Sequence, residues 1–332
     1  MQHLKRSAFL FVAIGLVLYA GLSFGCERLL FRNGHSNALY KIATAPAAAE
    51  YDWLVLGASH AMPLDFDDFN AFMQHETGLR IVNLASPGTG PLYNRFVLQS
   101  FLRAHRAGNL LYVVDSFGFW SRAWNEDRFA DAKLIRGTPF APATAALLSD
   151  YVRDDGVSPK ALLDYVSGFS KVNNRDRFQR DAWDGEAQFD RVYRPSASAV
   201  NKRIAYLYPD PQAPVVLARY IDVFTGLIAI ARQHDMRVTA VKLPAPAQFR
   251  NQLRGEAAFN EGLTRLLAER AVPLCDFSTE IDDPALYFDT DHLNRKGLTE
   301  LFQRRLKAVL ATSGCGVRPE AAIRSPSSHA AL

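Results

Sequence analysis

Cysteine is scarce in this chain, and no basic block is present. The 332 residues include three cysteines, Cys26, Cys275 and Cys315, and their spacing matches no zinc motif. A disulfide between Cys275 and Cys315 is open in an oxidising compartment, but three cysteines cannot all pair within one chain. The net charge of +4 is small, and Lys and Arg form no long run, so we expect no nucleic-acid partner.

Charged side chains are also absent from residues 7–26. A helix of about 20 residues rises about 30 Å, the thickness of a bilayer core. We therefore predict that residues 1–26 form an uncleaved signal anchor in the inner membrane, with the amino end inside and the following domain periplasmic. Two alternatives stay open: a cleaved signal peptide, suggested by the small-x-small sequence Ser23-Phe24-Gly25, and a lipoprotein modified on Cys26.

Composition divides the rest of the chain into three parts. Residues 27–50 are predicted to be a connecting segment, and residues 51–312 a globular domain interrupted by an insertion at about 116–210. The tail, residues 313–332, is rich in Ser, Pro and Ala and is predicted to be disordered. With 48% hydrophobic and 22% charged residues, the chain is typical of globular proteins.

Short apolar runs alternate with helical patterns through the globular domain. This alternation predicts an α/β fold, three-layer α/β/α, with a mostly parallel central sheet. The predicted strands are 53–56, 79–84, 109–115, 237–244 and 272–277, and the predicted helices include 92–101, 213–234, 255–270 and 295–310.

Ser59 follows the first predicted strand, after Gly57. Phe66, Phe69 and Phe72 further along suit a helix. The serine is therefore expected near the carboxyl end of that strand, before this helix, where open α/β sheets bind ligands. The N-terminus of a nearby helix would supply N–H groups for an oxyanion. The alternative is that Ser59 is only a turn residue.

Asp289, Asp291 and His292 lie together in a polar loop before the last helix. The order Ser…Asp…His is known for nucleophilic triads, in which the imidazole removes the serine proton and the carboxylate orients the imidazole. His60 is also next to Ser59, but neighbouring side chains on a tight turn diverge, which favours His292 as the base. The loop alternatively serves only to start a helix. No metal or cofactor is expected.

Together these segments resemble the SGNH (GDSL-like) hydrolase superfamily. Gly57-Ala58-Ser59-His60 is similar to its serine block, Asn83-Leu84-Ala85-Ser86-Pro87-Gly88 to its glycine block, and Asp289-Thr290-Asp291-His292 to its final block. The resemblance implies Ser59 as nucleophile, His292 as base and Asp289 as the partner of His292. It also implies an oxyanion hole made by the N–H groups of Ser59 and Gly88.

The third block departs from the family. Where the family has Gly-x-Asn-Asp, this chain reads Val114-Asp115-Ser116-Phe117-Gly118. Ser116 and Asn125 are the candidates to replace the missing asparagine as oxyanion donor. The anchor and the final block resemble the branch that works beside membrane-bound O-acyltransferases, such as alginate O-acetylation and teichoic-acid D-alanyl transfer proteins, which implies a polysaccharide acceptor and such a partner.

The insertion holds three tryptophans, Trp120, Trp124 and Trp183, as candidates for sugar stacking; the alternative is a small satellite core. His60, Ser116, Asn125 and Asp291 are further candidates for substrate binding. The sequence thus predicts a membrane-anchored O-acyltransferase or esterase that acts on an extracytoplasmic polysaccharide. The competing hypothesis is a non-catalytic subunit that uses the same scaffold to dock a membrane acyltransferase or polymer synthase.

Overall fold

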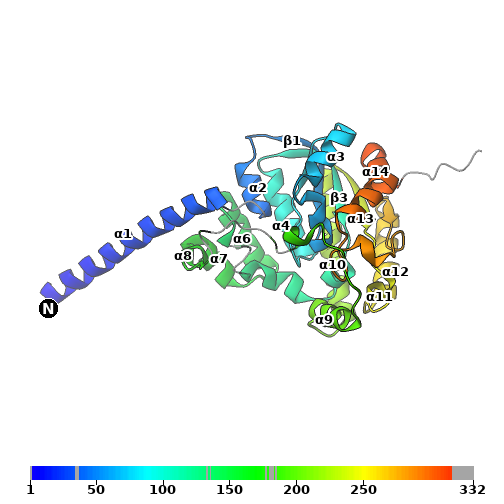
Figure 1. Ribbon diagram of the computed structural model, residues 1–332. Helices are drawn as coiled ribbons and strands as arrows, with labels where there is room; N and C mark the ends of the chain where they lie inside the picture. The colour runs from blue at the N-terminus through cyan, green and yellow to red at the C-terminus, as the bar shows by residue number, and fades with distance from the viewer. Residues whose placement is uncertain are drawn as a thin grey trace, which may run out of the picture.

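The protein is described here from a computed structural model. The structure describes residues 2–33, 37–131, 134, 136–175, 178, 183 and 185–315. An α/β body carries one long N-terminal helix that projects away from it (Figure 1). Most of the predicted tail, residues 316–332, lies outside the described residues.

The centre of the body is a parallel sheet in the order β2-β1-β3-β4-β5. This confirms the predicted α/β fold. The apolar runs form the strands because a parallel sheet is covered on both faces and needs apolar side chains on both. The strands are β1 Glu50–Leu56, β2 Ile81–Asn83, β3 Arg106–Val113, β4 Arg237–Lys242 and β5 Leu274–Asp276.

Helices cover the sheet on two sides. Leu54 and Leu56 of β1 face one core with α4 (Pro91–Leu102), α10 (Pro214–Gln233) and α12 (Glu256–Glu269), whereas Trp53 and Val55 face the other. That second core is completed by α3 (Phe69–Thr77), α13 (Arg295–Leu301), the π-helical turn Phe302–Leu306 and α14 (Lys307–Thr312). The alternation of side chains along a strand produces the three layers.

The N-terminal helix α1 runs from Gln2 to Asn33, and its length and hydropathy fit a single membrane span. A second helix, α10, passes the same test of length and composition, but Tyr220, Phe224 and Leu227 on it are fully buried against the sheet. An apolar helix with one face in the core is a normal element of a globular body. Among the described residues, α1 is therefore the one candidate span left after α10 is assigned to the core.

The predicted connecting segment 27–50 is wrong in part. α1 continues through Glu27 to Asn33, and a second helix, α2 (Ala38–Thr44), lies against α4. Asn37 caps α2 by accepting hydrogen bonds from the N–H groups of Leu39 and Tyr40. Ala38, Leu39 and Tyr40 are buried, and burial of this apolar turn holds the segment on the body.

The predicted insertion consists mainly of short helices. Three 3₁₀ turns, Ser116–Phe119, Arg122–Trp124 and Glu126–Ala130, follow β3. They lead to α6 (Pro142–Asp154), α7 (Pro159–Ser167) and α8 (Phe169–Val172), and α9 (Ala197–Leu207) follows later. Gly168, with φ of 68°, separates α7 from α8.

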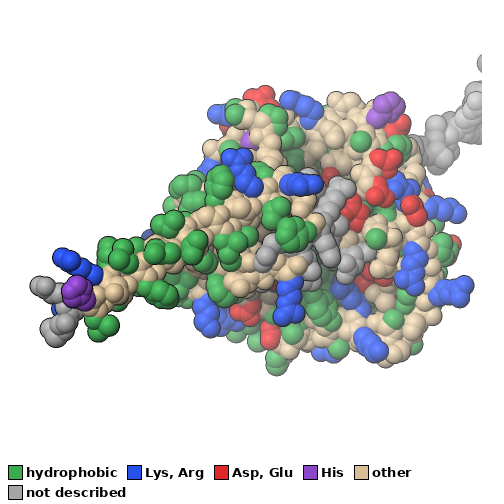
Figure 2. Space-filling model, turned by 60° about the vertical axis from the view of Figure 1, so that its left-hand side comes forward, with side chains coloured by type: hydrophobic (Ala, Val, Ile, Leu, Met, Phe, Trp, Pro, Cys, Tyr) green, Lys and Arg blue, Asp and Glu red, His purple; other side chains and the backbone are tan. Residues whose placement is uncertain are grey.

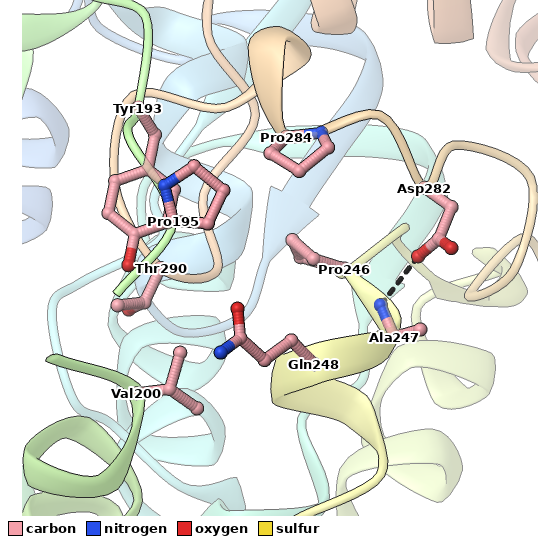
Figure 3. Close-up of a pocket in the computed structure, with 9 residues that line it drawn as sticks. All are labelled: Tyr193, Pro195, Val200, Pro246, Ala247, Gln248, Asp282, Pro284 and Thr290. Carbon is pink, nitrogen blue, oxygen red and sulfur yellow. Dashed lines mark hydrogen bonds between the residues drawn. The ribbon is translucent and has the colours of Figure 1, made fainter. Parts of the chain in front are cut away.

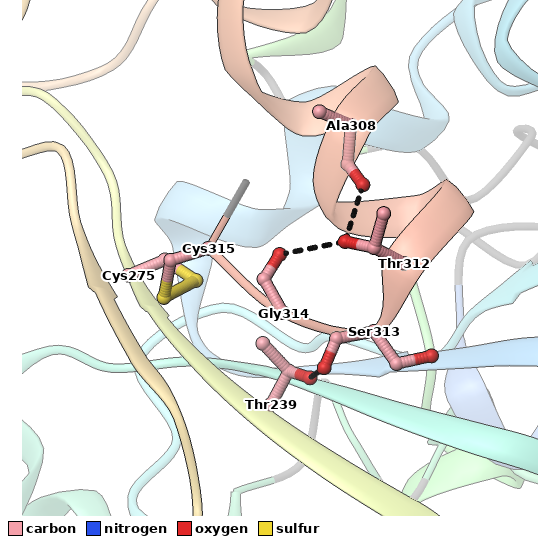
Figure 4. Close-up of a disulfide and its surroundings, with 7 residues drawn as sticks. All are labelled: Thr239, Cys275, Ala308, Thr312, Ser313, Gly314 and Cys315. Carbon is pink, nitrogen blue, oxygen red and sulfur yellow. Dashed lines mark hydrogen bonds between the residues drawn. A yellow bond between two sulfur atoms is a disulfide. The ribbon is translucent and has the colours of Figure 1, made fainter. Parts of the chain in front are cut away.

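The start of the predicted tail is attached to the sheet. Cys275 of β5 forms a disulfide with Cys315 (Figure 4). The Thr239 hydroxyl on β4 donates to the carbonyl of Ser313 at 3.1 Å, and Thr312 Oγ1 donates to the carbonyl of Gly314 at 3.2 Å. Residues 313–315 therefore belong to the body, and the domain boundary predicted at residue 312 falls at least three residues too early. The remaining cysteine, Cys26, is buried in α1.

Candidate active site

Ser59 lies just beyond the carboxyl end of β1. Gly57 joins the strand to the serine with φ of 151°, and a Cβ atom there would lie 2.9 Å from the carbonyl oxygen of Val113. The α-helix expected after Ser59 is present as α3, which begins at Phe69, but a 3₁₀ helix, Ser59–Asp65, lies between the serine and α3. Pro63 favours this tighter segment, since proline has no N–H to donate and disfavours α geometry in the residue before it.

His292 reaches Ser59 from the loop between β5 and α13. A short antiparallel bridge between Tyr287 and Leu293 closes this loop, and the Phe288 N–H donates to the His292 carbonyl at 3.0 Å. Asn294 caps α13 by accepting from the Gly297 N–H at 3.0 Å. The Asn294 amide also donates to the carbonyl of Ala285 at 2.9 Å. The loop therefore holds His292 in a fixed direction.

Ser59, His292 and Asp289 form one chain of hydrogen bonds. His292 Nε2 lies 2.9 Å from Ser59 Oγ, and His292 Nδ1 lies 2.9 Å from both carboxylate oxygens of Asp289. A carboxylate can only accept, so Nδ1 donates to Asp289 and Nε2 is left to accept the Ser59 proton. The structure thus brings together the three residues proposed as a triad, with Ser59 and His292 only 4% and 1% exposed.

Asp289 is held by its own loop. Its Oδ1 atom accepts from the backbone N–H groups of His292 at 2.8 Å and Asp291 at 3.1 Å. The carboxylate is 36% exposed, so water reaches it from outside while His292 stays covered. These backbone donors fix the direction in which the carboxylate faces the imidazole of His292.

His60 belongs to a second cluster beside the first. Its Nδ1 binds Asp115 Oδ1, and its Nε2 lies 3.2 Å from Asp291 Oδ2 without meeting the geometry of a hydrogen bond. Burial alone would lower the pKa of His60, but Asp115 and then Asp291 outweigh it and raise the pKa to about 10. His60 is therefore an imidazolium at neutral pH, unsuited to accept the Ser59 proton.

Asp291 is fully buried, and Arg203 of α9 neutralises it. Two guanidinium nitrogens of Arg203 reach its Oδ2 at 3.0 Å and 2.8 Å. Burial would raise the pKa of Asp291, but Arg203, His292 and His60 lower it well below its usual value. Asp291 therefore places a charge beside both histidines, 3.2 Å from His60 Nε2 and 3.8 Å from His292 Nδ1.

One set of side chains in the described part of the chain could offer ligand atoms to a metal ion. One atom each from His60, Asp291 and His292 lie within 4.8 Å of one another. A cation there would compete with Arg203 for Asp291 and would need His60 in its neutral form. His292 would also have to leave either Ser59 or Asp289. The donor set therefore fits a proton-bearing cluster better than a metal centre.

Gly88 lies in a tightly held loop after β2. Its φ is 61°, and a Cβ atom there would lie 2.9 Å from the ring of Trp124. Thr89 Oγ1 donates to the Gly57 carbonyl at 3.2 Å, which ties this loop to the Ser59 segment. Arg128 donates to the Pro87 carbonyl at 2.6 Å. Thr89 and Ser86, on either side of Gly88, thus bind the Gly57 carbonyl two residues before Ser59, and the role of Gly88 as an oxyanion donor stays a prediction.

Asn125 and Trp124 have structural contacts that oppose their predicted roles. Asn125 is fully buried, and its amide donates to the carbonyls of Gly118 at 2.8 Å and Ser121 at 2.9 Å. Both amide hydrogens are thus used, and none remains for an oxyanion. The Oδ1 atom accepts from the Leu92 N–H at 2.9 Å. Trp124 is 4% exposed and donates to the Leu207 carbonyl. Both residues brace the Gly88 loop instead.

Trp120, Ser116 and Trp183 differ in position. Trp120 is 4% exposed and lies against Gly255, so it offers no face to a sugar. Ser116 is also buried, beside Asp115 at the end of β3. Trp183 is only partly buried, and its ring meets that of His292 edge to face with centroids 5.2 Å apart. Of the three predicted tryptophans, Trp183 is the one whose ring contacts a triad residue.

A cavity of about 300 Å³ opens beside the triad loop (Figure 3). Thr290, which lies between Asp289 and Asp291 in sequence, forms part of its wall, and the side chain of Gln248 extends into the space. The other lining residues are Tyr193, Pro195, Val200, Pro246, Ala247, Asp282 and Pro284. The cavity combines apolar walls with a few polar groups, which is typical of ligand sites.

Sequence reasoning missed two residues of the site, Asp115 and Arg203. Asp115 follows β3 at the same edge of the sheet as Ser59, and this position was itself a signal, because polar residues after parallel strands gather at one edge. Arg203 had no such signal. It lies in the insertion, and only the folded chain brings it to Asp291 across 88 residues.

No protein-family model matches the chain, and no curated protein is similar to it in sequence. Three similar solved structures, in order, are a protein described as an acylhydrolase from Bacteroides fragilis, a GDSL-like lipase from Bacteroides thetaiotaomicron and a protein described as a platelet activating factor from Streptococcus pneumoniae. Their identities are 7%, 6% and 11%, and their TM-scores 0.41, 0.41 and 0.38. The matches cover 83%, 82% and 90% of this chain and 94%, 95% and 99% of theirs. Such low scores do not place the chain in a family.

Proposed function

We propose that this chain is a membrane-anchored serine O-acyltransferase or esterase of the SGNH kind, acting on an extracytoplasmic polysaccharide. The observation that carries the proposal is the continuous hydrogen-bonded chain from Ser59 through His292 to Asp289. A serine hydroxyl needs such a base to become nucleophilic near neutral pH, and the carboxylate stabilises the imidazolium that forms.

The first step would form an acyl-enzyme on Ser59. As Ser59 Oγ attacks the carbonyl carbon of an acyl donor, its proton passes to His292 Nε2. The backbone N–H groups of Ser59 and Gly88 would hold the oxyanion. His292 then gives the proton to the departing alcohol or thiol as the bond to the leaving group breaks, and the acyl group remains as an ester of Ser59.

The second step would transfer the acyl group to a sugar hydroxyl. His292 Nε2 takes the proton of the acceptor hydroxyl, whose oxygen attacks the Ser59 ester, and returns it to Ser59 Oγ as the ester bond breaks. Water in place of the sugar gives hydrolysis. Because Ser59 is 4% exposed and Trp183 lies against His292, the site has the covered character that favours a bound acceptor over water.

The cavity beside Thr290 is the proposed acceptor site. It adjoins the loop that carries Asp289 and His292, and its lining offers an amide in Gln248, a hydroxyl in Thr290 and a carboxylate in Asp282. Hydroxyl-rich sugars need donors and acceptors of this kind, and the prolines around them provide apolar contact to the ring faces.

Two features support an extracytoplasmic location. The disulfide between Cys275 and Cys315 is typical of oxidising compartments such as the periplasm. The helix α1 continues unbroken past the candidate cleavage site at Gly25, and Tyr19 and Glu27 on either side of that site both contact the body. We therefore propose an uncleaved anchor in the inner membrane, with the body in the periplasm and a membrane-bound O-acyltransferase as a candidate acyl donor.

A serine-reactive phosphonate probe tests the nucleophile. The wild-type protein should label, Ser59→Ala should not, and Ser149→Ala should label like wild type because Ser149 is an exposed residue of α6 far from the triad in sequence. Equal labelling of Ser59→Ala and wild type would contradict the proposal.

Transfer and hydrolysis are separated by their products. The full chain in detergent is given an activated acetyl ester, with or without an oligosaccharide, and the products are weighed by mass spectrometry. Transfer predicts an acetylated oligosaccharide that Ser59→Ala does not form. Release of free acetate alone, unchanged by the oligosaccharide, would leave an esterase.

A second candidate function follows from the altered third block. Val114-Asp115-Ser116-Phe117-Gly118 stands where the family has Gly-x-Asn-Asp, and the Asp115 side chain is engaged with His60. Loss of one oxyanion donor costs about 10²–10³ in rate, which is compatible with a subunit that keeps the scaffold for docking. Absence of phosphonate labelling of the wild type would favour this non-catalytic subunit.

A further inference from the structure

A group of large apolar side chains lies exposed on the body beside α1. Leu163, Val166 and Phe169 are 69%, 56% and 61% exposed, and Phe140 is 48% exposed. We call these four residues the junction patch. Single exposed apolar residues are ordinary, but a group of this kind marks an interaction surface. Figure 2 shows the hydrophobic side chains of α1 continuing onto the body where the helix joins it.

The patch extends the apolar side of α7 onto the exposed surface. Ala161 and Tyr165 are buried against the body, whereas Leu163 and Val166, three residues apart, are exposed, and the polar side of the helix begins at Lys160. The water-facing part of a surface helix normally carries polar residues. The exposed apolar edge of α7 is therefore suited to an apolar environment.

Contacts with α1 fix where the patch lies. The Tyr19 hydroxyl donates to the Ser167 carbonyl at 3.0 Å, at the turn between α7 and α8. Glu27 forms an ion pair with Lys171 of α8, and the Lys171 side chain is only 3% exposed. The Glu27 carboxylate also accepts from the Phe140 N–H at 3.3 Å. The patch is thus fastened to α1 at two points, one inside the apolar run and one just beyond it.

These contacts set the depth of the patch relative to the apolar run. Tyr19 precedes Cys26, the last residue of the uncharged run, by seven residues, or about 10 Å of helix rise. Moving the span toward the N-terminus far enough to leave Tyr19 in water would bury Lys5 and Arg6 in the hydrocarbon, which is costly. The α7–α8 turn therefore meets α1 at or within the bilayer boundary.

Basic residues mark the same boundary. Arg28 and Arg32 follow the apolar run on α1, and the Arg28 guanidinium lies over the ring of Phe24 at 5.0 Å. Arginine and aromatic side chains are enriched where a helix leaves the bilayer, because they reach phosphate headgroups while their apolar parts stay in the acyl chains.

We propose that the junction patch inserts into the outer surface of the lipid bilayer next to α1, as a second, monotopic membrane contact. The occupant is lipid: acyl chains against Leu163, Val166, Phe169 and Phe140, with anionic headgroups near Arg28 and Arg32. This inference rests on α1 spanning the membrane, as proposed above, but not on acyl transfer. Two attachments hold the body at a fixed tilt, so the opening near Thr290 keeps a constant direction relative to the membrane.

A depth measurement tests the proposal on the full chain. In a Cys26→Ala background, Cys275 and Cys315 stay oxidised, so a single introduced cysteine takes an environment-sensitive fluorophore. The test position is Val166→Cys. The matched control is Val215→Cys, which is 75% exposed on the first turn of α10. This part of α10 lies away from the junction patch, because Arg219 of α10 contacts Asp155 after the C-terminal end of α6, whereas Phe140 precedes its N-terminal end. Val12→Cys, 56% exposed on α1, reports the span itself.

The labelled proteins are placed in nanodiscs whose lipids are brominated near the headgroup end of the acyl chain. Emission at Val166→Cys should fall about two-fold relative to unbrominated lipid, and emission at Val215→Cys should not change. Quenching at Val12→Cys without quenching at Val166→Cys would leave the anchor in place and overturn the patch, whose partner would then be a protein. No quenching at Val12→Cys would overturn both the anchor and the patch.

Discussion

His60 and His292 lie with ring centroids 4.7 Å apart, yet they bind different carboxylates. His292 donates to Asp289 and turns its other nitrogen to Ser59, whereas His60 binds Asp115. Asp291 lies between the rings, 3.2 Å from His60 Nε2 and 3.8 Å from His292 Nδ1. The two neighbouring imidazoles thus differ in role: His292 is placed to exchange a proton with Ser59, and His60 stays charged.

The charge on His60 predicts a pH-dependent contribution to stability. Its pKa is about 10 in the folded protein and about 6.5 in an unfolded chain, so folding takes up a proton between these values. The stabilisation is complete below pH 6.5 and is lost as the pH rises toward 10, with an upper limit of ~5 kcal/mol. We expect His60→Gln to be less stable than wild type at pH 6.5, and the difference to shrink toward pH 10.

Urea unfolding at several pH values measures this difference. His75→Gln is the control, because His75 is 87% exposed and away from the cluster in sequence. A difference between His60→Gln and wild type that stays constant from pH 6.5 to 10 would contradict a protonated His60.

Asp289→Asn tests how His292 is oriented. Asparagine keeps one oxygen for the backbone N–H groups of Asp291 and His292, so the loop should survive. Its amide cannot hold the Nδ1–H tautomer as a carboxylate does, and the phosphonate labelling rate should fall by roughly 10³–10⁴. The melting temperature should change little, because Asp289 is 36% exposed. Asp222→Asn, at an exposed position of α10, is the control. Labelling at the wild-type rate by Asp289→Asn would exclude Asp289 from the triad.

Local pattern predicted the framework of this site, because the framework is local. The strand ending at Leu56, the glycine at 57 and the Asp-x-x-His spacing are readable in short windows, and they place Ser59, Asp289 and His292 at one edge of the sheet. Pro63 was readable too, and it accounts for the 3₁₀ segment that separates Ser59 from the expected helix α3.

The roles of the insertion could not be read in this way. Trp124 and Asn125 seemed free to meet a substrate, but the fold directs them to the carbonyl of Leu207 and to the backbone around Gly118. Aromatic and amide side chains serve a core or a site equally well, and only their tertiary neighbours decide. The same holds for Arg203, whose partner lies 88 residues away.

Asn125 is expected to act through the Gly88 loop. Asn125→Ala would leave the Leu92 N–H and the carbonyls of Gly118 and Ser121 buried without partners, at a cost of about 1–3 kcal/mol for each group left unsatisfied. We expect a lower melting temperature and slower phosphonate labelling. Asn173→Ala, on the exposed end of α8, is the control and should leave both unchanged. A stable Asn125→Ala protein would show that the loop needs no such brace.

Trp183 is predicted to keep water from the acyl-enzyme. Its ring lies against His292, with centroids 5.2 Å apart, and against Phe66 at 5.6 Å. Trp183→Ala should therefore raise the ratio of hydrolysis to transfer several-fold, about 1 kcal/mol, while phosphonate labelling of Ser59 persists. Trp183→Phe keeps an aromatic ring there and should restore the wild-type ratio. An unchanged product ratio in Trp183→Ala would assign the exclusion of water to another residue.

The disulfide is expected to stabilise the last helix on the sheet. Cys275 is buried in β5, and Cys315 holds the residues after α14 across a separation of 40 residues. Closing a loop of this length stabilises the folded state by roughly 2–4 kcal/mol.

Cys315→Ser removes the link without disturbing the core around Cys275, because Cys315 is exposed. We expect its urea midpoint to fall, and reductant to lower the wild-type midpoint to the same value. Reductant should leave the midpoint of Cys315→Ser unchanged, because both cysteines that remain in this variant, Cys26 and Cys275, are free thiols. A wild-type midpoint that ignores reductant would show that α14 is held by its packing and by the Trp53 indole, which donates to the Leu310 carbonyl at 3.0 Å.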